Sequence, residues 1–189
     1  LLSELIGGGK CFLTPSCTHA LEIMAMVLGI GAEDEVIVPS YTFVSTANAF
    51  RKFGAQIVCA DSGKDNPNIS AESIERCISH KTKAICVVHY AGEPCEMDRI
   101  SRICQEKGIY LLEDAAQALG GTYKGKPLGS IGSLAAFSFH ETKNVGCGEG
   151  GCLVVNDLTL VSKCEIIRER VRIDLVSTAG RSTSTAGSK

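Results

Sequence analysis

The sequence contains no tryptophan, and aromatic residues make up only 5% of its 189 positions. It also lacks an excess of charge, because 19 lysines and arginines stand against 21 aspartates and glutamates. Proteins that hold nucleic acid or a membrane surface electrostatically carry a basic patch or stripe. The composition therefore predicts no nucleic acid partner and no membrane partner.

Long apolar runs are absent as well, and no stretch is long enough to cross a bilayer. No leader with a charged start and an apolar centre opens the chain. We therefore expect a cytoplasmic protein. Because the first residue is leucine and not methionine, we also expect that a natural N-terminal segment is missing.

The ten cysteines contain no Cys-x-x-Cys pair, and no cluster of His and Cys has the spacing of zinc ligands. Three of the four histidines, His19, His89 and His140, are scattered over separate segments. We therefore predict no metal site. Most cysteines lie inside apolar runs such as QIVCAD (56–61), which is typical of buried free thiols in a reducing compartment.

Apolar runs that suit strands alternate with segments that suit helices. The strands are predicted at 11–14, 35–39, 56–61, 83–89, 109–114, 134–140 and 151–157. The helices are predicted at 18–29, 43–54, 70–79, 97–108 and 158–170, with a turn-rich segment at 120–132. Runs of β-branched residues without alternation, joined by helices, indicate an α/β fold whose mostly parallel sheet has helices on both faces.

In such a sheet, ligands bind beyond the carboxyl ends of the strands, so polar residues there are candidates for a site. Asp114 ends a predicted strand and Gln117 follows it; Asp114 is either a helix N-cap or a carboxylate that holds a ligand cation. Lys143 follows another strand and is either a solvated surface residue or a half-buried amine suited to imine chemistry. A strand-end aspartate with a strand-end lysine suits pyridoxal phosphate, where the lysine forms the Schiff base and the aspartate pairs with the pyridinium nitrogen.

The segment TPSCTHALE (14–22) offers a cradle for the phosphate of that cofactor. A strand, a small-residue turn and a helix start would turn the backbone N–H groups of Thr18 and His19 toward an anion. The hydroxyls of Thr18 and Ser138 would add hydrogen bonds, although Thr18 is equally an ordinary N-cap. Phe43 either stacks on the pyridine ring or is a core aromatic. The run GCGEGG (146–151) is not a P-loop, and we interpret it as a tight turn.

Five motifs together resemble one family. They are LTPSCTHALE, DEVIVPSYTFVSTANAF, VVHYAGEPCEMD, EDAAQALGGTYKGKPLGSIG and FSFHETKNVGCGEGG. In this order they resemble the DegT/DnrJ/EryC1/StrS sugar aminotransferases, from about residue 10 to residue 169. These are fold-type I pyridoxal-phosphate enzymes. The resemblance is strongest to the branch that makes dTDP-4-amino-4,6-dideoxygalactose from dTDP-4-keto-6-deoxyglucose.

The resemblance implies a role for each matching residue. Lys143 would be the Schiff-base lysine and proton carrier, with Asp114 at the pyridinium, Gln117 beside the ring and Phe43 stacked on it. The residues expected to hold the phosphate are Thr18, His19 and Ser138. Glutamate would donate the amino group and a nucleotide-linked keto sugar would accept it, in a homodimer. Some relatives have His in place of this lysine and are dehydrases; a dehydrase or a lyase remains the alternative enzyme.

The resemblance also implies that the chain is incomplete. Residues 1–169 would be a partial large domain that lacks an N-terminal segment and the C-terminal small domain. Residues 170–189 depart from the family pattern, and deletion of one adenine from a family-like coding string reproduces Arg170–Thr185, so we interpret them as an out-of-frame tail. The natural alternative is a divergent tail. We expect little or no activity from such a piece; the other possibility is a gene product without function.

Overall fold

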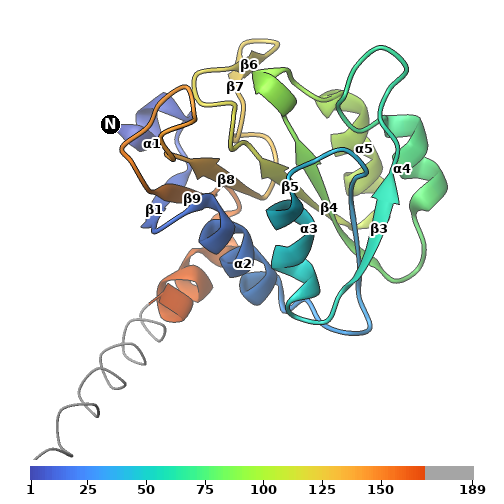
Figure 1. The fold of residues 1–189 in the computed structure, drawn as a ribbon. Coiled ribbons are helices and arrows are strands. Elements are labelled where there is room, and N and C mark those ends of the chain that lie inside the picture. Colours follow the sequence, from blue (N-terminus) through green and yellow to red (C-terminus); the bar gives the residue numbers. More distant parts are fainter. Residues whose placement is uncertain (169–189) are drawn as a thin grey trace, which may run out of the picture.

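The computed structural model describes residues 1–168. Its main sheet has seven strands in the order β1-β9-β8-β5-β4-β2-β3 (Figure 1). β9 is antiparallel to both of its neighbours, β1 and β8, whereas β8, β5, β4, β2 and β3 pair in parallel. The prediction of a mostly parallel sheet is therefore confirmed. The strands are β1 (Lys10–Thr14), β2 (Glu35–Pro39), β3 (Gln56–Ala60), β4 (Thr82–Val88), β5 (Tyr110–Asp114), β8 (Leu134–Ser138) and β9 (Gly151–Val155).

The helices, apart from the first, lie close to their predicted positions. They are α1 (Leu2–Leu5), α2 (Cys17–Leu28), α3 (Val44–Arg51), α4 (Ala71–Cys77) and α5 (Met97–Lys107), with 3₁₀ turns η1 (Tyr90–Gly92) and η2 (Leu158–Leu160). Residues 161–168 are helical after η2. The turn-rich segment contains a small hairpin of β6 (Thr122–Tyr123) and β7 (Lys126–Pro127). The short α1 was not predicted, because four residues carry no helical period.

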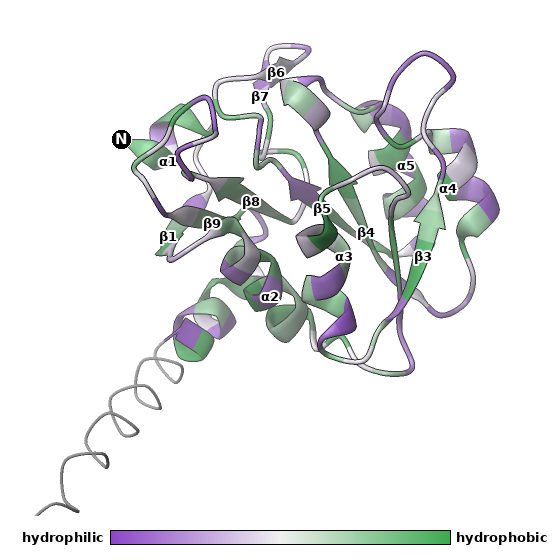
Figure 2. Ribbon diagram, in the orientation of Figure 1, coloured by the Kyte–Doolittle hydropathy of each residue, from purple (hydrophilic) through white to green (hydrophobic). Residues whose placement is uncertain are grey.

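Helices cover both faces of the sheet and bury its apolar strands (Figure 2). On one face α2 and α3 pack on the strands around the buried residues Met24 and Phe50. On the other face α4 and α5 pack around Ile74 and Ile100, and α1 with the 115–128 segment covers β8 and β9. Strands buried on both faces explain why the sequence shows apolar runs in place of alternation.

Several predicted ends differ from the structure. Phe43 is the N-cap of α3 and lies outside the helix, which ends at Arg51 before a turn at Gly54. The strand predicted to reach His140 ends at Ser138, because residues 139–150 turn back into β9. The tail predicted at 170–189 lies outside the described residues. Within residues 1–168, no helix is both long and apolar enough to cross a membrane.

Candidate active site

A cavity of about 600 Å³ opens at the edge of the sheet where the parallel strands end. Residues that follow β1, β2, β4, β5 and β8 contribute to its wall, and Gly150 enters it just before β9 begins. This is the edge where α/β sheets bind ligands, because loops diverge there and leave a crevice. The fold therefore places the cavity where the sequence predicted a site.

Six of the seven predicted site residues line this cavity: Thr18, Phe43, Asp114, Gln117, Ser138 and Lys143. His19 does not line it. His19 is exposed, and its backbone N–H donates to Oγ of Ser16 at 3.3 Å. The prediction that this N–H is free is wrong, because Ser16 is the N-cap of α2 and uses it.

Asp114 ends β5 and presents a buried carboxylate to the cavity, with 5% of the residue exposed. Its Oδ2 accepts from the Thr46 hydroxyl at 2.7 Å and its Oδ1 from the Ala116 N–H at 3.2 Å. Burial raises the pKa of Asp114, while these two hydrogen bonds and the nearby His89 and Lys143 act in the opposite direction. Asp114 forms no ion pair with any residue from 1 to 168, so the carboxylate remains available to a ligand cation.

Lys143 reaches the same cavity from the 139–150 connection and is half-buried. Its backbone N–H donates to the carbonyl of His140 at 2.9 Å, which holds the turn. In the described part of the chain its Nζ makes no hydrogen bond or ion pair. Within residues 1–168, an amine and a carboxylate that form no ion pair therefore share one cavity.

The N-terminus of α2 forms a third part of the wall. It lies against β9, because a Cβ atom on Gly151 would stand 2.4 Å from the carbonyl carbon of Ser16 and 2.5 Å from the nitrogen of Cys17. Thr18 and the buried Ser138 add hydroxyls, with Thr18 Oγ1 donating to Ser45 at 3.0 Å. A helix N-terminus with nearby hydroxyls suits an anion.

Gln117 is oriented by a contact that the sequence did not predict. Its Oε1 accepts from the backbone N–H of Ala91 at 2.6 Å, which leaves the amide NH₂ as the donor for the cavity. Ala91 adopts a left-handed backbone with φ of 54°, which is unusual for a residue other than glycine. Tyr41 and Tyr90 also line the wall, with their hydroxyls 3.2 Å apart. Their only signal in the sequence is their position. Tyr90 directly follows the strand predicted at 83–89, and Tyr41 lies two residues after the strand predicted at 35–39.

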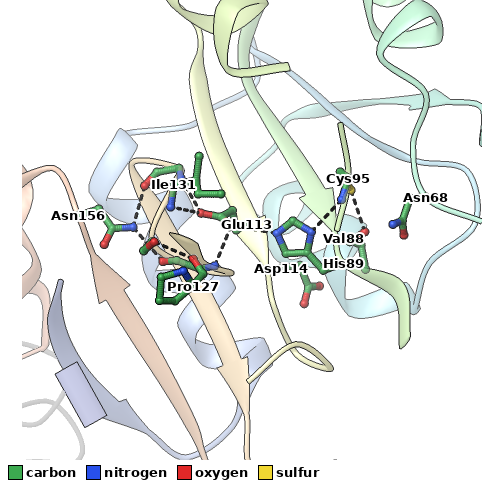
Figure 3. Close-up of polar contacts among 12 residues, drawn as sticks. Asn68, Val88, His89, Cys95, Glu113, Asp114, Pro127, Ile131 and Asn156 are labelled. Atoms are coloured by element: carbon green, nitrogen blue, oxygen red, sulfur yellow. Dashed lines mark hydrogen bonds and ion pairs between the residues drawn. The ribbon is translucent and has the colours of Figure 1, made fainter. Parts of the chain in front are cut away.

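Behind the cavity, the neighbouring Glu113 points away from Asp114, since consecutive strand residues face opposite sides of the sheet. Figure 3 shows Glu113 between His89 and the loop before β8. Its carboxylate accepts the backbone N–H groups of Gly129, Ile131 and Gly132 and contacts His89 Nε2 at 2.9 Å. This network ties the end of β5, which carries the cavity, to His89 and to the 129–132 loop.

Residues 1–179 match the model of the DegT/DnrJ/EryC1/StrS aminotransferase family. The chain belongs to this family. DegT/DnrJ/EryC1/StrS enzymes depend on pyridoxal phosphate, so the resemblance found in the motifs is confirmed at the level of the family.

Individual relatives within the DegT/DnrJ/EryC1/StrS family agree. An uncharacterized protein of Methanocaldococcus jannaschii is 43% identical over 168 residues, which are 89% of this chain and 44% of that protein. GDP-perosamine synthase of Escherichia coli O157:H7 is 41% identical over 147 residues, 78% of this chain and 40% of the enzyme. A Streptococcus pneumoniae protein described as a sugar aminotransferase, in its PLP form, superposes with a TM-score of 0.82 at 33% identity, over 89% of this chain and 47% of that one. The chain thus spans less than half the length of these relatives.

The cavity suits the cofactor of the DegT/DnrJ/EryC1/StrS family. Pyridoxal phosphate has a ring nitrogen that binds a proton, an aldehyde and a phosphate. The buried carboxylate of Asp114, the amine of Lys143 and the N-terminus of α2 offer a partner to each in turn. The residues present therefore fit the group.

Proposed function

We propose that the whole protein transfers an amino group to a keto sugar linked to a nucleotide, with pyridoxal phosphate as cofactor. The observation that carries this proposal is that Asp114 and Lys143 line one cavity without forming an ion pair within residues 1–168. Family membership supports it. So does the similarity to GDP-perosamine synthase, whose name refers to a nucleotide-linked amino sugar.

The predicted site residues that line the cavity each have a role in this proposal. When bound, pyridoxal phosphate supplies an electron sink that stabilises negative charge on the carbon beside an amine. Asp114 holds the proton on the ring nitrogen, and Lys143 Nζ binds the aldehyde group and moves protons to and from the reacting carbon. Thr18 and Ser138 bind the phosphate, because they lie at or beside the N-terminus of α2, which favours an anion.

Two further side chains orient the ring in this proposal. Phe43 is 73% exposed and lines the cavity mouth, where it covers one face of the ring. Gln117 donates its NH₂ to the ring edge, since Ala91 occupies its Oε1. Lysine in place of histidine at position 143 favours transamination over the dehydrase reaction of some relatives.

The finer proposal concerns the substrate and the assembly. The substrate is dTDP-4-keto-6-deoxyglucose, the donor is glutamate, and the product is dTDP-4-amino-4,6-dideoxygalactose, made in the cytoplasm by a homodimer. Residues 1–169 are part of the large domain of that enzyme, and 170–189 are the out-of-frame tail. Because the chain spans 44% and 40% of two relatives, the 189 residues alone have little or no turnover.

The cofactor is tested directly on the 189-residue chain. We expect pyridoxal phosphate to give a visible absorbance band, and borohydride reduction to attach it to Lys143, located by mass spectrometry of the peptides. Lys143→Ala loses the adduct, whereas Lys126→Ala, at an exposed lysine in β7, keeps it. An adduct spread over surface lysines, or none in the unmodified chain, contradicts the proposal.

The substrate is tested on the protein with its missing parts restored. Glutamate with dTDP-4-keto-6-deoxyglucose should yield an amino sugar, which mass spectrometry distinguishes from a deoxygenated dehydrase product. The same assay with the GDP-linked keto sugar separates the two nucleotides. Faster amination of the GDP sugar would contradict the finer proposal and leave the cofactor chemistry intact.

A further inference from the structure

Thr46 makes a hydrogen bond to Asp114 that joins two segments far apart in the sequence. It lies in α3, is 1% exposed, and its Oγ1 donates to Oδ2 of Asp114 at 2.7 Å. Thr46 does not belong to the cavity wall, although Asp114 does. The hydroxyl therefore supports the carboxylate from behind.

A second hydroxyl extends this contact back to the cavity. Thr42 Oγ1 lies 2.9 Å from Thr46 Oγ1, and Thr42 lines the cavity. A hydroxyl has one proton, and that of Thr46 is donated to Asp114, so Thr42 is the donor to Thr46. The two threonines thus form a chain of hydrogen bonds from the cavity wall to the buried carboxylate.

The other groups around Asp114 show why this donor matters. The buried Cys86 lies in β4, and His89 directly follows that strand. Lys143 approaches from the 139–150 connection. Cys17 approaches from α2, with its Sγ 4.0 Å from Oδ1. Glu113, on the same strand, points to the opposite face. α3 contributes no charge at this contact, only the Thr46 hydroxyl. Burial penalises an ionised carboxylate unless hydrogen bonds compensate, and those to charged groups are the stronger ones.

We propose that Thr46, supported by Thr42, is a positioning residue that keeps Asp114 ionised and aimed into the cavity. That the cation held there is the ring nitrogen of pyridoxal phosphate rests on the proposed function. Oδ2 is committed to Thr46 and Oδ1 accepts the Ala116 N–H, so the carboxylate cannot rotate without losing one of the two bonds.

The first test measures Asp114 itself in the chain without cofactor, by NMR titration of its side-chain carboxyl. Thr46→Val keeps the shape and removes the donor, so we expect the acid dissociation constant of Asp114 to fall about tenfold. Thr46→Ser keeps the hydroxyl and should leave the constant near its original value. Thr42→Val should lower the acid dissociation constant of Asp114 too, but by a smaller factor than Thr46→Val. It replaces Thr46→Val in the test if that variant does not fold.

Thr82→Val is the matched control. Thr82 is also a buried threonine, 9% exposed, but it lies at the amino end of β4, where its Oγ1 accepts from the Ser79 N–H. The Thr82→Val substitution can therefore lower the stability of the fold without removing any hydrogen bond to Asp114. An Asp114 titration that is unchanged in Thr46→Val, or shifted equally in Thr82→Val, overturns the positioning role.

The second test measures pyridoxal phosphate binding against pH. A purely structural role lowers the affinity equally at every pH, whereas loss of the Thr46 donor moves the acid limb of the profile up by about one pH unit. If Thr46→Val shifts the carboxyl titration while the unmodified chain binds no pyridoxal phosphate, the proposed function fails and the positioning role stands. If the chain binds the cofactor with the same pH profile with and without the Thr46 hydroxyl, only the positioning role fails.

Discussion

His89 donates from Nε2 to Oε2 of Glu113 across 2.9 Å, and both side chains are fully buried. The backbone N–H of Cys95 donates to Nδ1 of the same ring, so the ring proton lies on Nε2. Glu113 also binds three backbone N–H groups of the 129–132 loop. The pair therefore joins the ends of β4 and β5, which carry the cavity, to the loop that leads into β8 (Figure 3).

Glu113→Gln should destabilise the fold strongly. The new NH₂ group is a donor that would face backbone N–H donors, and at least one buried donor loses its acceptor. We expect a loss of about 3 kcal/mol in the free energy of unfolding, measured by urea titration. Glu72→Gln, which removes only the exposed pair with Arg76, should cost less than about 1 kcal/mol. Equal losses for the two variants would count against the buried network.

Gly151→Ala should push α2 away from the sheet. The new Cβ atom would stand 2.4 Å from the carbonyl carbon of Ser16. Because that carbon belongs to the backbone, it cannot move aside as the end of a flexible side chain could. We expect a loss of about 1–3 kcal/mol, together with weaker phosphate binding seen by calorimetry. The control is Gly31→Ala, where an added Cβ meets nothing within 4 Å. A Gly151→Ala chain as stable as the control would show that α2 does not need this close approach.

Asp114→Asn should change how the stability of the cofactor-free chain depends on pH. The free energy of unfolding of the variant, minus that of the original chain, should be larger at neutral pH than at acid pH. Burial raises the pKa of Asp114, so between its ordinary and raised pKa the folded chain holds more protons than the unfolded chain. Stability therefore falls as pH rises through that window and stays lower above it. Asparagine does not ionise and lacks this loss. Urea unfolding from about pH 4 to about pH 7 tests it; a difference between the two chains that does not change with pH contradicts it.

All ten cysteines are free thiols, and the most exposed should react long before the most buried. Cys59 and Cys147 are exposed and should be alkylated first by iodoacetamide at neutral pH. Burial raises the pKa of Cys95, Cys104 and Cys152 to about 12, so these thiols should react only after unfolding. Mass spectrometry of the labelled peptides locates the sites. Early labelling of Cys104 in folded chain would contradict the buried core.

The sequence by itself determined which edge of the sheet carries the site and several of the residues that line it. Apolar runs at 109–114 and 134–140 predicted parallel strands, and parallel strands bring their carboxyl ends to one edge. Asp114, Gln117 and Lys143 were therefore predicted to meet, and the structure brings them to one cavity. The motifs identified the family for the same reason, because they surround these strand ends.

Only the tertiary structure decided the contacts behind those residues. Thr46 and Asp114 are far apart in the chain, as are Ala91 and Gln117, and no local pattern predicts that they meet. The antiparallel direction of β9 is likewise absent from the sequence pattern, since a strand buried on both faces reads the same in either direction. His19 was misplaced because its local motif suits an anion, whereas the neighbouring Ser16 caps the helix. The ends of strands and the spacing of apolar residues are local properties of the sequence. The acceptor that a buried donor finds depends on how helices and strands pack together.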